Sequence, residues 1–162
     1  MFNTREGAQR ILEFNIQNHH STFVLNQMPN SYLGFDYGTR RIGVAVGQEI
    51  TRTATGVVTL QSVNNQPDWN GIARLIGDWQ PVALVVGLPL NMDDSENPRT
   101  ALVRRFCNQL RERFKLPVHT MDERLSTIEA QRLLAQSGSK RDRDSDKLAA
   151  QLILQSWLEQ PR

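Results

Sequence analysis

Two consecutive strands around a tight bend are the feature that most constrains the fold of this sequence. From Tyr32 to Gly47 the chain reads YLGFDYGTRRIGVAVG. Bulky and small residues alternate along each half, which is the period of a β-strand with one face packed on the core. Asp36 stands on the small-residue face, between two glycines. This pattern predicts room beside its carboxylate for a large group, such as a hydrated cation or a phosphate backbone; alternatively, the glycines only let a helix pack closely.

The rest of the chain alternates strands with helices. Strands are expected at 53–60, 82–86 and 116–121, and helices that begin near Asp68, Pro98, Ser126 and Asp146. Residues 82–86 form a continuous apolar run, which is typical of a strand covered on both faces. Since a crossover between parallel strands is right-handed, this order predicts an α/β fold with a mixed five-stranded sheet. The expected strand order is 3-2-1-4-5, with the second strand antiparallel and helices on both faces.

Composition and length indicate one folded domain. Of the 162 residues, 39% are hydrophobic and 22% are charged, which is ordinary for a soluble globular protein. We expect residues 1–29 to be an extension, weakly structured or forming a short helix, and residues 30–160 to form the domain. One cysteine excludes an intrachain disulfide, and neither a secretion signal nor a membrane-spanning run is visible. The sequence therefore predicts a cytoplasmic protein with no membrane partner.

Basic residues are unevenly distributed, although the net charge is only +2. Residues 99–115 contain six basic side chains and one acidic side chain, and residues 140–147 mix lysine and arginine with three aspartates. Such patches suit a polyanionic partner, but they are equally typical of a solvated surface.

Three acidic residues come together in the predicted topology. Asp36 lies in the first strand, Glu123 follows the fifth strand, and Asp146 lies at the start of the last helix. Without matching cysteines or clustered histidines, carboxylates favour hard cations such as Mg²⁺ or Mn²⁺. Two such ions about 4 Å apart can activate a water molecule and stabilise the leaving oxygen of a phosphodiester. Asp142 and Asp144 are close alternatives to Asp146, which could instead serve as a helix cap.

Four motifs in combination resemble the YqgF (RuvX) family of bacterial ribonuclease H-like proteins. They are GFDYGTRRIGVAVG, VVGLPLNMDD, DERLST and SDKLAAQLILQSWLE, and the resemblance extends from Tyr32 to Glu159. It implies a ribonuclease H-like fold in which Asp36, Glu123 and Asp146 are the catalytic and metal-binding carboxylates. The family usually reads NMDG where this chain has NMDD, a departure that affects the geometry of a turn and no catalytic carboxylate.

The resemblance implies a metal-dependent nuclease that processes the 5′ end of pre-16S rRNA during ribosome biogenesis. The alternatives are a Holliday-junction resolvase with the same site and a non-catalytic nucleic-acid-binding regulator. The expected partner is structured RNA or branched DNA, bound by a monomer or a weak homodimer. By position, the candidates for contacting nucleic acid are Thr39, Arg41, Asn91, Arg124, Ser126 and Lys140.

Overall fold

A computed structural model describes residues 29–124 and 143–161, except for the side chains of Arg143 and Asp144. Its elements are β1 (Ser31–Tyr37), β2 (Arg41–Gln48), β3 (Thr53–Gln61), α2 (Trp69–Trp79), β4 (Ala83–Leu88), α3 (Pro98–Phe114), β5 (Val118–Asp122) and α5 (Arg143–Glu159). Residues 1–28, which make up nearly all of the predicted extension, lie outside the described residues. The predicted helix at Ser126 lies outside them as well. None of the helices described is long and apolar enough to cross a membrane.

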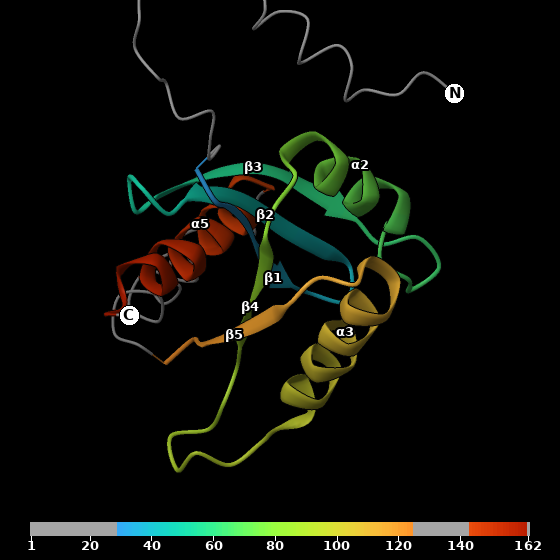
Figure 1. The fold of residues 1–162 in the computed structure, drawn as a ribbon. Coiled ribbons are helices and arrows are strands. Elements are labelled where there is room, and N and C mark those ends of the chain that lie inside the picture. Colours follow the sequence, from blue (N-terminus) through green and yellow to red (C-terminus); the bar gives the residue numbers. More distant parts are fainter. Residues whose placement is uncertain (1–28, 125–142, 162) are drawn as a thin grey trace, which may run out of the picture.

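The five strands form one mixed sheet in the order β3-β2-β1-β4-β5. β2 pairs antiparallel with both β1 and β3, whereas β4 pairs parallel with β1 and β5 (Figure 1). The sheet order and strand directions predicted from the sequence are therefore confirmed.

Several predicted boundaries differ from the structure by a few residues. β3 ends at Gln61 rather than at residue 60, and β4 spans Ala83–Leu88 rather than residues 82–86. β5 begins at Val118, two residues later than expected, because Lys115 ends α3 in a left-handed conformation and Pro117 has no N–H to donate. The last helix begins at Arg143, slightly before the predicted start near Asp146.

The alternation along β1 divides the core into two layers. Leu33 and Phe35 belong to one buried cluster, which includes side chains of α2 and α3. Tyr32 belongs to the other cluster, which includes most of the buried side chains of α5. The helices therefore cover both faces of the sheet, with α5 on one side and α2 and α3 on the other (Figure 1).

Helix α5 lies against a face of the sheet that has few side chains. A Cβ atom added at Gly34 would lie 2.6 Å from the Leu154 Cβ, and one added at Gly43 would lie 1.9 Å from the Asp146 carbonyl oxygen. The predicted room for a large group is therefore wrong at Gly34, because α5 fills that space. The alternative explanation, that the glycines let a helix pack closely, holds at both positions.

Replacing Gly43 by alanine tests this close approach. Because the new methyl group would overlap a backbone oxygen of α5, we expect Gly43→Ala to lower the free energy of unfolding by about 3 kcal/mol or more. The matched control is Gly77→Ala on α2, where nothing lies within 4 Å of the added Cβ. That change should raise stability by roughly 0.5–1 kcal/mol. Urea unfolding measures both, and equal stability of the two variants would contradict the packing of α5 on β2.

Candidate active site

Asp36 and Asp146 line one open pocket of about 730 Å³. Asp36 lies near the end of β1, on the face that carries α5, and pairs in register with Gly43 of β2. The backbone of Asp146, in the first turns of α5, lies directly over Gly43. Two strands and one helix therefore bring together two acids that are 110 residues apart in the sequence.

Glu123 reaches the same face of the sheet from the other side of Asp36. Its N–H donates to the Leu88 carbonyl (3.1 Å), which continues the pairing of β4 and β5 by one step. Its carboxylate Oε1 lies 2.6 Å from the place that a Cβ at Gly87 would occupy, and Gly87 follows the residue of β4 that pairs with Phe35. Asp36 therefore lies on the strand between Gly43, covered by Asp146, and Gly87, covered by Glu123.

Burial and ion pairing distinguish the three acids. Glu123 and Asp146 are 6% and 8% exposed, whereas Asp36 is partly exposed. The Arg41 Nε lies 2.9 Å from the Asp146 Oδ2, so that a guanidinium group already compensates this buried carboxylate. Burying a charged carboxylate is costly unless a cation accompanies it. The site is therefore built to hold positive charge next to its acids.

Carboxylate oxygens are the ligands that hard divalent cations take, so the donor chemistry of this face suits Mg²⁺ or Mn²⁺. Within residues 29–124 and 143–161, however, no three His, Cys, Asp or Glu side chains are close enough together to hold a metal ion. Among the described residues, the three acids therefore lie on one face of the sheet but are not close enough together to share one metal ion. Asp142 and the side chain of Asp144, the alternatives for the third acid, lie outside the described residues.

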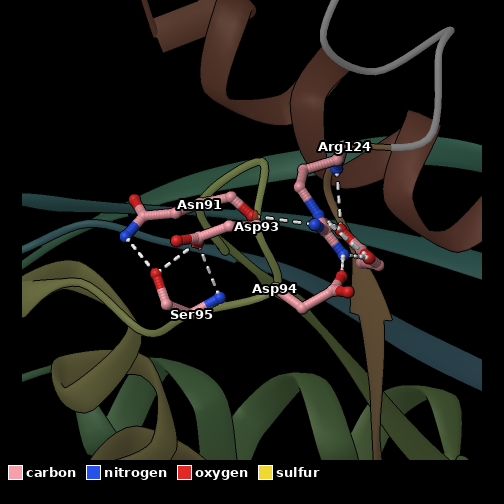
Figure 2. Close-up of polar contacts among 6 residues, drawn as sticks. Asn91, Asp93, Asp94, Ser95 and Arg124 are labelled. Carbon is pink, nitrogen blue, oxygen red and sulfur yellow. Dashed lines mark hydrogen bonds and ion pairs between the residues drawn. The ribbon is translucent and has the colours of Figure 1, made fainter.

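The predicted nucleic-acid contacts fall into separate groups. Thr39 and Arg41 lie in and next to the β1–β2 loop and line the pocket with Asp36. Asn91 and Arg124 instead belong to a network of hydrogen bonds that joins the end of β5 to the loop between β4 and α3 (Figure 2). The remaining two candidates, Ser126 and Lys140, lie outside the part of the chain that the structure describes.

All three nitrogens of the Arg124 guanidinium donate to protein oxygens. Nε donates to Asp122 Oδ1 (3.0 Å), Nη1 to the Asn91 carbonyl (2.7 Å), and Nη2 to Asp122 Oδ2 (2.6 Å) and Asp94 Oδ1 (2.7 Å). These bonds lower the pKa of the Asp122 carboxyl, because the hydrogen bonds from Arg124 favour its charged form. Arg124 thus fixes both residues that precede it, Asp122 directly and Glu123 through the backbone.

The NMDD departure from the usual family motif has a structural explanation at Asp94. This residue has φ 67°, a left-handed conformation that glycine adopts without steric cost and that aspartate tolerates better than most residues. Its carboxylate also binds Arg124, although Asp94 is 84% exposed and such a pair contributes little stability. The turn is therefore kept without glycine.

The pocket has further lining residues that sequence reasoning missed. They are Arg40, Gln61, Ser62, Asn64, Asn65 and Arg99, together with Tyr37 and Gly38. The sequence of residues 61–66 by itself indicates only a polar loop. Two signals could have indicated their role: the Asn-Asn pair is typical of a tight hairpin turn, and Arg99 begins the basic region 99–115.

A mixed five-stranded sheet in the order β3-β2-β1-β4-β5, with β2 antiparallel to both of its neighbours, is the architecture expected of a ribonuclease H-like protein. The model of the RuvX family, described as "Holliday junction resolvase", matches residues 30–160, and the chain belongs to this family. It is therefore a nuclease, an enzyme that hydrolyses phosphodiester bonds.

Curated relatives agree with this assignment. A Pseudomonas putida protein is 52% identical over 131 residues, which cover 78% of this chain and 93% of the relative. A Legionella pneumophila protein is 49% identical over 132 residues, which cover 80% of this chain and 95% of the relative. Both carry the name "Putative pre-16S rRNA nuclease". Among solved structures, the fowlpox virus resolvase with its Holliday junction DNA matches with a TM-score of 0.48 and 11% identity over 80% of this chain and 97% of that chain.

The Arg124 network makes a testable prediction about the pH dependence of stability. Folding lowers the pKa of Asp122 below the ordinary carboxyl pKa of about 3.9. The ion pair with Arg124 therefore stabilises the fold in full above that ordinary pKa. Its contribution is lost as the pH falls through the lowered pKa of the folded state. We expect Arg124→Gln to lower the free energy of unfolding at neutral pH. Below about pH 4 the free energies of unfolding of the variant and the wild type should approach each other.

Chemical unfolding at a series of pH values measures this difference. Arg74→Gln, which changes an exposed arginine of α2, is the matched control and should leave stability unchanged at every pH. A difference between wild type and Arg124→Gln that stays constant down to strongly acidic pH would contradict the prediction.

Proposed function

We propose that the chain is a metal-dependent nuclease that processes the 5′ end of pre-16S rRNA during ribosome biogenesis, in the cytoplasm. One observation carries the chemistry: Asp36 and Asp146 line one pocket, and Glu123 covers the neighbouring strand on the same face of the sheet. The name shared by the curated relatives supports the substrate.

In this proposal the carboxylates of Asp36, Glu123 and Asp146 hold Mg²⁺ or Mn²⁺, with two ions bound. Nucleases of the ribonuclease H-like fold generally use divalent metal ions. When bound, such ions supply an activated water and stabilise the charge of the leaving oxygen. The low exposure of Glu123 and Asp146 supports this role, because a buried carboxylate is stabilised by a cation at close range.

Arg41 has two successive roles in the proposed cycle. Without a metal ion it compensates Asp146 through the ion pair at 2.9 Å. With a metal ion held at Asp146, the guanidinium of Arg41 would be available to a phosphate oxygen of the substrate, for which its planar set of donors is well suited. Thr39, which lines the same pocket, offers a hydroxyl to a neighbouring phosphate oxygen.

Asn91 and Arg124 act on the site indirectly in this proposal. Their polar groups bind one another and the 91–95 loop, so they position Glu123 at the end of β5. Ser126 and Lys140 stay predicted contacts to nucleic acid.

Conservative replacement of each acid tests the proposed chemistry. We expect Asp36→Asn, Glu123→Gln and Asp146→Asn each to lower metal-dependent cleavage by about 100-fold or more, because each removes a charged ligand of the ions that stabilise the transition state. Asp78→Asn, at an exposed position of α2, is the control and should keep full activity. The readout is cleavage of labelled pre-16S rRNA leader in Mg²⁺ and in Mn²⁺, with thermal unfolding to check that each variant folds. An active Asp36→Asn variant would refute the site.

The description of the matching family favours a second candidate function, resolution of four-way DNA junctions. Symmetric resolution requires a two-fold dimer, whereas trimming of an RNA end does not. Side-by-side cleavage of the rRNA leader and a four-way junction, with sedimentation of the protein, separates these functions. Nucleic-acid binding without metal-dependent cleavage would instead indicate the non-catalytic regulator.

We further propose that the folded domain comprises residues 30–160 and that residues 1–29 are an extension. The match of the family to residues 30–160 supports this division. A chain shortened to begin at Met28 should unfold at the same temperature as the full chain, as measured by circular dichroism. Failure of the shortened chain to fold would show that the extension contributes to the core.

A further inference from the structure

The pocket that contains Asp36 and Asp146 has a second wall, formed by none of the proposed metal ligands. This wall comes from the end of β3, the turn that follows it and the start of α3, and its polar lining residues are Gln61, Ser62, Asn64, Asn65 and Arg99. Arg40 and Arg41 lie in the lining as well, so the pocket has three guanidinium groups and two carboxylates. Its volume of about 730 Å³ is within the range of known ligand pockets.

The turn that forms this wall is held in one conformation. Val63 and Gln66 exchange two backbone hydrogen bonds, each 2.9 Å long. Between them, Asn64 (φ 52°) and Asn65 (φ 56°) are both left-handed, as a type I′ hairpin turn requires. The Ser62 N–H also donates to the Arg40 carbonyl (2.9 Å), which ties the turn to the β1–β2 loop. Both asparagine side chains therefore project from a fixed backbone.

The side chains on this wall suit two different parts of a nucleotide. An asparagine amide both donates and accepts hydrogen bonds, which allows it to read the polar edge of an unpaired base. A guanidinium group donates to phosphate oxygens. Asn64, Asn65 and Arg99 are exposed, so all three are accessible to a bound strand.

We infer that Asn64, Asn65 and Arg99 form a subsite for a single-stranded nucleotide next to the phosphodiester that is cleaved. Arg99 binds its phosphate, and the two amides bind the edge of its base. The subsite makes the enzyme selective for the sequence beside the cut. Only its placement beside the cut rests on the proposed function, since binding of the strand requires no cleavage.

Replacing both asparagines by glycine tests the base contact with little effect on the backbone, because glycine adopts the left-handed conformation freely. The parent protein is the full chain with Asp36→Asn, so that cleavage does not interfere. Its binding to fluorescein-labelled poly(U), poly(A) and poly(C) RNA is measured by anisotropy in Mg²⁺. We expect the parent to prefer one base, and Asn64→Gly with Asn65→Gly to weaken binding of that RNA by about fivefold or more and to remove the preference.

Arg99→Gln tests the phosphate contact. It should weaken binding of all three RNAs to a similar extent and reduce the slope of log K against log salt concentration by about 0.7, the value for one phosphate contact on a single strand. Arg52 is the matched control for both changes, because it is also left-handed (φ 51°) but lies in the β2–β3 turn at the opposite end of the sheet. Arg52→Gly and Arg52→Gln should leave the preference and the salt slope unchanged.

Each outcome bears on the inference. A parent that binds no single-stranded RNA or shows no base preference, a glycine variant that keeps the preference, or an unchanged salt slope for Arg99→Gln would overturn it. The wild-type chain could cleave no substrate while the parent binds one RNA selectively and the glycine variant loses that selectivity. This result would support the subsite and refute the nuclease proposal. Conversely, the wild type could cleave RNA while the glycine variant binds the three RNAs as the parent does. This result would refute the subsite alone.

Discussion

The close contact between α5 and the glycine-lined face of the sheet is the constraint on which the rest of the structure depends. At Gly43 the helix backbone lies where a side chain would otherwise be, and this contact holds the start of α5 over β2. Asp146 is consequently fixed beside the strand that carries Asp36. A side chain at residue 43 would hold the backbone of α5, and Asp146 with it, further from β2.

Two arginines support the buried acids at this place in the fold. Glu123 and Asp146 are almost completely buried, and a buried carboxylate without a nearby cation would destabilise the fold. Arg41 compensates Asp146 directly, and Arg124 fixes the chain next to Glu123 through Asp122 and the 91–95 loop. The two arginines thus serve the same group of acids in different ways, one as an ionic partner and the other as a support for the backbone.

Periodicity made the fold predictable. Alternation in β1 and β2, the continuous apolar run of β4, and the rule that parallel crossovers are right-handed suffice to derive the order 3-2-1-4-5. The role of Arg124 could not be predicted in the same way, because the hydrogen bonds to Asn91 and Asp94 join segments about 30 residues apart and depend on loop conformation. The turn at Asn64 and Asn65 is a similar case: its sequence indicates a tight hairpin, but its position at the pocket that Asp36 lines depends on where β3 ends.

The sequence by itself determined the strands, their order and the three acids that the topology directs to one face, because side-chain period and chain connectivity are local properties. Only the tertiary structure decided that the space at Gly34 is filled by a helix, that Arg41 binds Asp146, and that Asn64, Asn65 and Arg99 complete the pocket. These contacts join residues far apart in the chain, and their distances are set by the packing of whole elements on one another.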